Sequence, residues 1–244
     1  MEGIPKEIGR RLTGAKSVAV LTGAGLSAES GVPTFREAQS GLWARWHPED
    51  LATPEAFQRN PRLVWDWYRW RRQLVRDVEP NSGHLALVEL ERRVSAFHLA
   101  TQNVDGLHRR AGSRSLSELH GNLFRDLCAY EGTDVDLPDG EEEQPPRCPR
   151  CGGPVRPGVV WFGEPLPEAE LLAARSAANA CDIYLVVGTS GLVQPAAGLP
   201  LEARRSGAFV VEINPEATPL TESAHCWIRD GAGAVLVALL ESMP

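Results

Sequence analysis

Short runs of apolar, strand-favouring residues recur along the chain and are separated by segments with helical periodicity. The runs predict strands over residues 18–22, 96–101, 115–119, 183–187, 209–213 and 226–228. Apolar residues at helical spacing predict helices over 62–78, 82–93, 168–180, 199–206 and 233–241. Continuous apolar strands that alternate with helices are typical of a parallel sheet covered on both faces. The predicted fold class is therefore α/β, with a Rossmann-like, doubly wound parallel sheet.

Two stretches interrupt this alternation. Residues from about 38 to 79 have helical patterns rich in Trp and Arg but no strand pattern, and residues from about 125 to 156 carry three cysteines and an acidic, proline-bounded run. We expect both in a smaller inserted module, with a helical part and a loop-rich part that resembles a zinc ribbon. The larger domain of this single folded unit would then span about 1–37, 80–124 and 157–244, and the module about 38–79 and 125–156.

Composition narrows the class of protein. The chain has 244 residues, of which 43% are hydrophobic and 23% charged, as is ordinary for a globular protein. A net charge of −7 argues against a nucleic-acid partner held by general electrostatics. The longest apolar runs fall far short of the roughly 18 residues that a membrane span needs. The start lacks the pattern of a secretion signal, and the five cysteines are an odd number, so we expect a cytoplasmic protein without disulfides.

The first predicted strand runs directly into a glycine-containing turn. Gly23, Gly25 and Ala28 satisfy the Gly-x-Gly-x-x-Gly/Ala spacing that lets backbone amides approach a pyrophosphate. A tight strand-to-helix turn also favours glycine, and 31–33 (Gly-Val-Pro) interrupts the next helix early. On this segment alone, a simple turn and a phosphate cradle both stay open.

Polar or glycine residues follow four other predicted strands. These segments are 102–105, 120–122, 188–190 and 214–216. Because the carboxyl ends of parallel strands meet at one edge of a sheet, we expect the segments to converge on a crevice for a dinucleotide-sized ligand. Among the six histidines, His120 alone stands at such an edge with a glycine behind it. With a reference pKa near 6.5, its imidazole could serve as a base at neutral pH.

Several of these segments together resemble a known family. The stretches 23–36 (GAGLSAESGVPTFR), 101–108 (TQNVDGLH), 120–121 (HG), 158–164 (GVVWFGE) and 188–190 (GTS) look like the signature blocks of the sirtuins. Sirtuins are NAD-dependent protein lysine deacylases. The blocks are long, specific and in the family's order over nearly the whole chain.

The resemblance implies that NAD is consumed as a substrate. The carbonyl oxygen of an acyl-lysine would displace nicotinamide from its ribose. His120 would then act as base toward a ribose hydroxyl, which attacks the carbon of the resulting amidate. The products would be free lysine, nicotinamide and O-acyl-ADP-ribose. Asn103 and Asp105 match the family residues that hold nicotinamide and its ribose, so the expected catalytic set is His120, Asn103 and Asp105.

The resemblance also assigns binding residues. Those expected at NAD are Gly23, Ala24, Gly25, Ser27, Ala28, Glu29, Thr34, Phe35, Arg36, Trp43, Gln102, Asn103, Val104, Asp105, His120, Gly188, Thr189, Ser190, Asn214, Pro215, Glu216 and Ala232. Within this set, 23–27 would cradle the pyrophosphate, Phe35 and Arg36 would close over the ribose, and Ser190 and Asn214 would lie on the adenosine side. The residues expected to pair with an extended substrate peptide, as an added strand, are Val160, Trp161, Phe162, Gly163 and Glu164.

A cation lies within the apolar stripe of the helix predicted over 62–78. Arg71 shares that stripe with Tyr68, three residues earlier, so the guanidinium and the hydroxyl could converge on one carboxylate. A structural salt bridge or a snorkelling side chain is the alternative. Tyr68 and Arg71 match the Tyr-x-x-Arg pair of the sirtuin subclass that removes succinyl and malonyl groups, and Ala52 matches its small residue. Our hypothesis is that acidic acyl-lysines are substrates, alongside acetyl-lysine.

The cysteines indicate a metal site that lacks one ligand. Cys148 and Cys151 have the spacing of a metal knuckle. Sirtuins usually carry two such knuckles around a structural zinc, but the first reads Cys128-Ala129-Tyr130-Glu131 here. A site of three cysteines completed by Glu131, a weak site completed by water or another residue, and no metal all stay open.

Two other functions on the same scaffold are alternatives to a deacylase. One is a protein mono-ADP-ribosyltransferase, and the other a non-catalytic module that binds NAD or ADP-ribose. The presence of His120, Asn103 and Asp105 disfavours the second. The partners we expect are acylated lysine side chains of proteins and NAD, with neither nucleic acid nor membrane.

Overall fold

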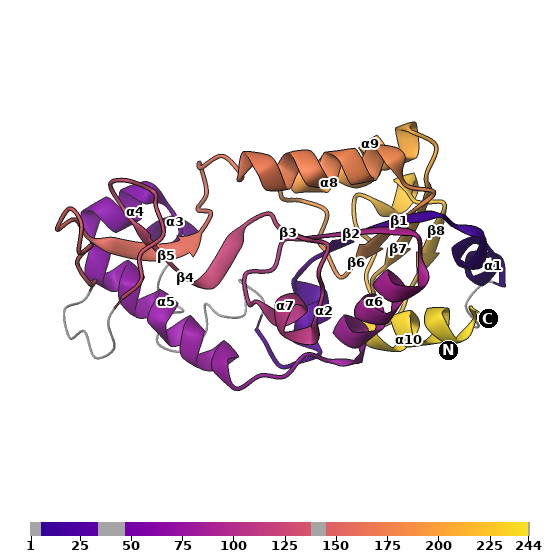
Figure 1. The fold of residues 1–244 in the computed structure, drawn as a ribbon, viewed down its shortest axis with the longest axis horizontal. Helices are drawn as coiled ribbons and strands as arrows, with labels where there is room; N and C mark the ends of the chain where they lie inside the picture. The colour runs from indigo at the N-terminus through magenta and orange to yellow at the C-terminus, as the bar shows by residue number, and fades with distance from the viewer. Residues whose placement is uncertain (1–5, 34–46, 138–144, 244) are drawn as a thin grey trace.

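The computed structural model describes residues 6–33, 47–137 and 145–243. Its centre is a six-stranded, wholly parallel sheet with the order β3-β2-β1-β6-β7-β8 (Figure 1). The strands are β1 (Ser17–Thr22), β2 (Ala96–Thr101), β3 (Leu116–Glu118), β6 (Ile183–Val187), β7 (Phe209–Ile213) and β8 (Cys226–Ile228). All six lie where the apolar runs predict them. The predicted α/β class with a doubly wound parallel sheet is confirmed.

Helices cover both faces of this sheet. They are α1 (Lys6–Gly14), α2 (Ala24–Ala28), α6 (Ser82–Arg93), α7 (Leu107–Ala111), α8 (Glu168–Ala180), α9 (Leu199–Arg205) and α10 (Ala232–Glu241). Figure 1 shows α8 and α9 on one face and α6 and α10 on the other. Two separate apolar clusters, one around Leu87 and Leu236 and one around Ala178 and Leu199, fill the space between the sheet and these layers. No helix in the described ranges is both long and apolar enough to cross a bilayer.

The chain changes direction across the sheet at β1. From β1 it moves outward to β2 and β3, and after a long excursion it returns on the other side of β1 as β6, β7 and β8. The register pairs Thr22 at the end of β1 with Thr101 of β2 and with Val187 of β6. The carboxyl ends of these central strands are therefore level, and the reversal of strand order leaves a crevice beside them.

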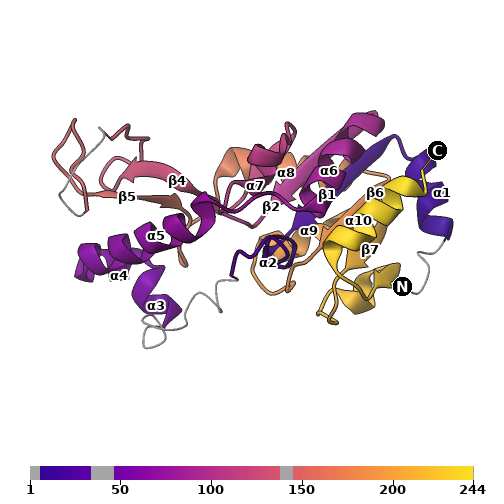
Figure 2. The ribbon, with the colours of Figure 1, turned by 90° about the horizontal axis from the view of Figure 1, so that it is seen from below.

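Two excursions from the sheet, one between β1 and β2 and one between β3 and β6, form a smaller group of elements at the far end of the molecule (Figure 2). It contains α3 (Pro48–Leu51), α4 (Pro54–Arg59), α5 (Pro61–Arg76), β4 (Gly121–Cys128) and β5 (Val155–Val159). β4 and β5 pair antiparallel in a sheet of their own, and hydrophobic patterning did not predict them. Each of these strands crosses a predicted domain boundary, so the exact division of the chain stays a prediction.

Two buried histidines, His84 of α6 and His108 of α7, lie against each other. The rings of His84 and His108 lie 4.8 Å apart between centroids, and His108 Nε2 is 2.9 Å from Thr22 Oγ1. Burial lowers the pKa of His84 to about 4. Burial, with a smaller contribution from His84, lowers the pKa of His108 to about 3. Both rings are therefore neutral in the folded protein at neutral pH.

This burial predicts a loss of stability in mild acid. Above pH 6.5 both rings are neutral whether the chain is folded or unfolded. As the pH falls from about 6.5 toward 4, only the unfolded chain takes up their protons, so the free energy of unfolding should fall by up to about 1.4 kcal/mol per pH unit for each histidine. Urea unfolding at pH 7, 6 and 5 measures this slope.

The slope should be shallower in a His84→Gln variant and unchanged in a His47→Gln variant, because His47 is exposed. Equal slopes for the wild type and His84→Gln would show that His84 does not contribute.

Candidate active site

A cavity of about 270 Å³ lies where the carboxyl edge of the large sheet faces the smaller group of elements. The segments that follow the sheet strands contribute Ser27 of α2, Gln102 and His120 to its wall, and the smaller group contributes Tyr68 and Arg71. The predicted residues that line it are Ala24, Ser27, Ala52, Tyr68, Arg71, Gln102, Asn103, Val104, Asp105, His120, Val160, Trp161, Phe162, Gly163 and Glu164. The fold thus brings together every residue of the predicted catalytic and substrate-binding sets.

The glycine turn after β1 packs against the turn after β6. Gly25 N–H donates to the Gly188 carbonyl at 2.8 Å. A Cβ atom on Gly25 would lie 2.8 Å from that carbonyl oxygen, and one on Gly23 would lie 2.7 Å from the Cα of Thr189. Gly188 itself has φ of +58°, a conformation that favours glycine. Direct contact between two backbone segments therefore requires glycine here, whether or not a phosphate binds.

The buried Asn103 and the half-buried Gln102 connect this turn to the end of β2. Asn103 donates from Nδ2 to the Gly23 carbonyl at 3.1 Å and to Ser27 Oγ at 3.0 Å, and Gln102 donates from Nε2 to Thr189 Oγ1 at 2.7 Å. The loops after β1, β2 and β6 are thereby held in one arrangement. Polar groups that are already bonded before a ligand arrives need no reorganisation on binding, which favours pre-organised recognition.

The imidazole of His120 is held in one tautomer. Its Nδ1 lies 3.0 Å from the Gln102 carbonyl oxygen. Because a carbonyl oxygen only accepts, Nδ1 carries the proton and Nε2 keeps its lone pair. Burial lowers the pKa of His120 and outweighs the bond to Gln102, which raises it. At neutral pH the ring is therefore an unprotonated base with a fixed orientation.

Asp105 is the one carboxylate of the predicted catalytic set, and it is only 4% exposed. Burial raises its pKa, while the Leu107 N–H at 2.9 Å, the Ser27 hydroxyl and the charge of Arg71 act in the opposite direction. The carboxylate thus lies among donors and a cation, which keep an anion tolerable in a buried position.

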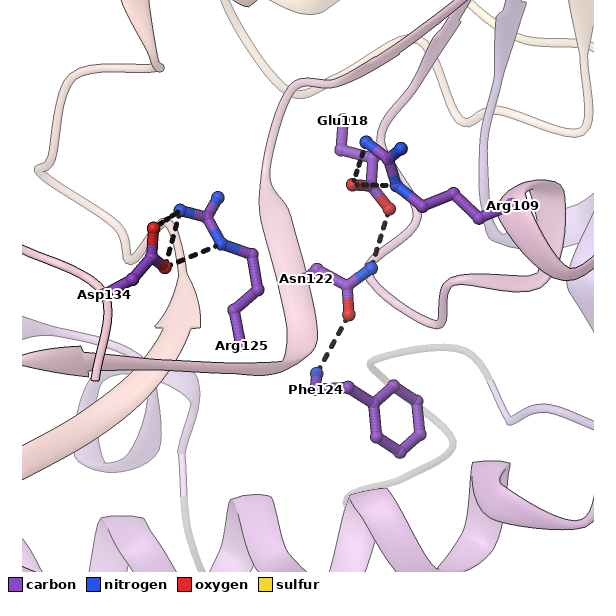
Figure 3. Close-up of polar contacts among 6 residues, drawn as sticks. All are labelled: Arg109, Glu118, Asn122, Phe124, Arg125 and Asp134. Carbon is purple, nitrogen blue, oxygen red and sulfur yellow. Dashed lines mark hydrogen bonds and ion pairs between the residues drawn. The ribbon is translucent and has the colours of Figure 1, made fainter. Parts of the chain in front are cut away.

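A second set of hydrogen bonds connects the residues on the two sides of His120. Figure 3 shows Arg109 and Asn122 converging on the buried carboxylate of Glu118. Asn122 Nδ2 donates to Glu118 Oε1 at 2.7 Å, and Asn122 Oδ1 accepts from the Phe124 N–H at 2.9 Å. The residues two before and two after His120 are therefore bonded to each other. We infer that this bond limits the movement of the turn that presents the imidazole.

Tyr68 and Arg71 lie on the face of α5 that meets the cavity. Tyr68 is buried and accepts a hydrogen bond from Trp161 Nε1 at 3.1 Å. Burial raises the pKa of Tyr68 to about 12, so its hydroxyl keeps its proton at neutral pH. Burial also lowers the pKa of Arg71, against the influence of Tyr68 and Asp105 nearby. The two side chains supply a hydroxyl and a guanidinium to the same part of the wall.

Several contacts hold the segment after β5 along the cavity. Glu164 accepts from the Trp161 N–H at 2.8 Å and forms an ion pair with Arg156, whose guanidinium lies 3.4 Å from the centroid of the Trp161 ring. Phe162 N–H donates to the Ala52 carbonyl at 2.9 Å. These contacts join the segment to the smaller group of elements and shape one side of the cavity.

The remaining predicted NAD residues that the structure describes do not line the cavity. Thr189 and Asn214 are bonded to each other beyond it, through Asn214 Nδ2 and the Thr189 carbonyl at 2.8 Å. The Glu29 carboxylate accepts from the Gly233 N–H in the first turn of α10. Also away from the cavity wall are Gly23, Gly25, Ala28, Gly188, Ser190, Pro215, Glu216 and Ala232. Thr34, Phe35, Arg36 and Trp43 fall outside the described residues.

Six lining residues are absent from the predicted set: Val32, Pro33, Val159, Leu166, Val193 and Gln194. Val193 and Gln194 continue the loop after β6, so extending each strand-end segment by a few residues would have found them. Val159 and Leu166 flank the predicted substrate segment on either side. Their apolar character gave no chemical signal.

The cysteines gather as predicted, but Glu131 does not join them. Ligand atoms of Cys128, Cys148 and Cys151 all lie within 4.8 Å of one another, and among the described residues no fourth donor belongs to the group. The Glu131 carboxylate instead pairs with Arg150 Nε at 3.4 Å and accepts from Thr133 Oγ1 at 3.3 Å. An ion pair thus holds the Glu131 carboxylate apart from the thiols, and which of the three open alternatives applies to the metal site stays a prediction.

Comparison with known proteins gives a consistent answer. The Sir2 family model matches residues 23–195. A protein of Ralstonia nicotianae named NAD-dependent protein deacylase is 55% identical, over 93% of this chain and 92% of its own length. A protein of the same name from Thermus thermophilus is 54% identical, over 98% of this chain and 95% of its own.

Solved structures agree with the sequences. A Sir2 homolog in complex with NAD superimposes with a TM-score of 0.92 at 43% identity, covering 99% of this chain and 96% of that one. A Sir2 complex with a p53 peptide and NAD superimposes with a TM-score of 0.86 at 30% identity, over 97% of each chain.

The packing of the two turns predicts that Gly25→Ala destabilises the protein. The added methyl group would meet the backbone of Gly188, so the free energy of unfolding should fall by about 1–3 kcal/mol in chemical denaturation. Gly14→Ala is the matched control, since its methyl group would meet no atom within 4 Å. A Gly25→Ala variant as stable as Gly14→Ala would show that the turns separate easily.

Proposed function

The chain belongs to the Sir2 family and is an NAD-dependent protein deacylase; from this premise we propose that the cavity removes acyl groups from lysine side chains of proteins. The observation that carries the proposal is the shared cavity wall. His120, Asn103 and Asp105 line it together with Tyr68 and Arg71, so a base and a polar acyl pocket face the same space.

We propose the following steps. The carbonyl oxygen of the acyl-lysine bonds to the ribose carbon that carries nicotinamide, while the bond to nicotinamide breaks and its electron pair leaves with the neutral ring. Nε2 of His120 then takes a proton from a ribose hydroxyl, whose oxygen attacks the carbon of the O-alkylamidate. Water is consumed as the carbon–nitrogen bond to lysine breaks, giving free lysine and O-acyl-ADP-ribose. Atoms and charge balance with one NAD and one water for each acyl group.

The residues around His120 fit their proposed roles. Asn103 and Asp105 are 7% and 4% exposed, which suits groups that hold nicotinamide and its ribose away from bulk water. The segment 160–164, braced by Glu164, is the proposed edge for the substrate peptide. A neutral imidazole with its proton on Nδ1 is the form that general base catalysis requires.

The pKa of His120 predicts the acidic limb of the reaction. Activity needs the neutral ring, so it should be present above the folded pKa and be lost as the pH falls through it. Because burial depresses that pKa below 6.5, the limb of kcat/KM should lie below pH 6.5. The pH profile of peptide deacylation measures it.

His120→Ala should lower kcat by about 10²- to 10⁴-fold and remove this limb, while NAD binding stays within a few-fold. His47→Ala, at an exposed position, should behave as the wild type. Undiminished turnover by His120→Ala would contradict the assigned base. Mass spectrometry of the peptide distinguishes removal of the acyl group from addition of ADP-ribose.

We propose that Tyr68 and Arg71 select acidic acyl groups. A succinyl or malonyl carboxylate could accept from the protonated Tyr68 hydroxyl and from the guanidinium together, and such charge-assisted bonds are the strong ones. Ala52, 3% exposed in the same wall, leaves room beside them. An acetyl group has no carboxylate and gains nothing from either donor.

Arg71→Met should lower kcat/KM for a succinyl-lysine peptide by about 10- to 100-fold, because a bond to a charged group is lost, and change that for the acetyl-lysine peptide by less than about threefold. Arg69→Met is the matched control, since Arg69 is exposed on the same helix and pairs with Asp66. Equal losses on both peptides would contradict the selective role.

A further inference from the structure

The cysteine group has the shape of a metal site with three ligands in place. Cys128 lies at the end of β4, and Cys148 and Cys151 belong to the turn before β5. The sulfur atoms of Cys128 and Cys151 are 3.4 Å apart, and the Gly153 N–H lies 3.4 Å from Cys151 Sγ. All three thiols are free. Three sulfur ligands within mutual reach suit three corners of the tetrahedron that zinc prefers.

Among the described residues no fourth donor joins the three thiols, and at the fourth corner the group differs from a closed structural site. Structural zinc sites normally take all four ligands from the protein, and carboxylate is an uncommon choice. The Glu131 carboxylate is held by Arg150 and Thr133 and does not belong to the thiol group. Arg150 is itself positioned by a bond from its guanidinium to the Asp134 carbonyl at 3.2 Å. Moving Glu131 to the sulfurs would require breaking this set of contacts.

The accessible member of the group indicates where an outside ligand can enter. Cys128 and Cys148 are buried, at 0% and 1% exposure, whereas Cys151 is exposed. We propose that Cys128, Cys148 and Cys151 bind one zinc-like divalent ion whose fourth ligand comes from solvent or a small thiol, so that the ion exchanges with its surroundings. A metal with an exchangeable position differs from a closed four-cysteine site in spectrum and in rate of release.

Such an ion would stabilise the helix that carries the proposed acyl pocket. Cys128 and Cys148 share an apolar cluster with Trp65 of α5. Arg72, on the same helix, pairs with Asp126 of β4 at 2.7 Å. The ion would therefore hold β4, the knuckle turn and α5 together. None of the three cysteines lines the reaction cavity, so its role would be structural.

Cobalt substitution tests the open position without measuring activity. The purified protein is loaded with Co²⁺ under anaerobic conditions, and 2-mercaptoethanol is then added. The visible spectrum should shift, and the sulfur-to-cobalt absorption should rise by roughly one third, because the number of Co–S bonds goes from three to four. Failure to bind Co²⁺, or a spectrum that does not respond to the added thiol, would overturn the proposal.

Variants at position 131 provide the comparison with the wild type in Co²⁺ spectrum and in zinc release. Glu131→Cys restores the missing thiol, so its Co²⁺ spectrum should resemble the thiol-saturated wild type without any addition and should ignore 2-mercaptoethanol. Its zinc should transfer to a chelator at least roughly tenfold more slowly. Glu131→Ala should match the wild type in both measurements. A tenfold faster release from Glu131→Ala would make Glu131 a ligand and overturn the proposal, whatever the activity of the enzyme.

Discussion

Backbone lies directly against backbone at the point where β1 and β6 end, and the rest of the site is arranged around that contact. Gly23 and Gly25 touch Gly188 and Thr189 at distances that leave no space for a side chain. Because β1 is also where the strand order reverses, this contact closes the base of the crevice in which an α/β sheet binds its ligand. A separation of the turns would displace the donors that Asn103 and Gln102 place across them.

The chemistry of the cavity depends on burial more than on the number of charges. Burial lowers the pKa of His120 and raises the pKa of Tyr68 further above neutrality, while an N–H, a hydroxyl and a guanidinium lie near the buried carboxyl group of Asp105. The same wall thus holds a base, a hydroxyl donor and a carboxyl group, and burial moves the pKa of each in its own direction. Such separation of pKa values by environment is a common property of catalytic sites.

The smaller group of elements contributes to the cavity because its strands adjoin segments that line it. β4 and β5 continue from the segments that carry His120 and the proposed peptide edge, and α5 packs on them with Tyr68 and Arg71 facing the cavity. Substrate selectivity and catalysis are therefore built on different parts of the chain that meet in one cavity. Cys128 and Cys148 of the thiol group pack with Trp65 of α5, so this group also contacts the helix that carries Tyr68 and Arg71.

Much of this arrangement was readable in the order of residues along the chain. Apolar runs such as Ile-Tyr-Leu-Val-Val in β6 predict buried parallel strands, since each side chain there is buried on one face or the other. The polar residues after those strands had to meet at one edge, and Arg71 stood out as a cation within an apolar stripe. These features follow from local periodicity, which a sequence carries in full.

Other features arise from contacts between distant segments, and periodicity carries no record of them. β4 and β5 contain charged residues, a proline and two glycines, so antiparallel pairing with an irregular register makes them strands. The choice between a simple turn and a cradle at Gly25 depends on Gly188, which lies far along the chain. Glu131 has the spacing of a ligand, yet Arg150 and Thr133 hold its carboxylate away from the sulfurs. Spacing tells which residues are able to meet, and the competing partners in the folded chain select those that do.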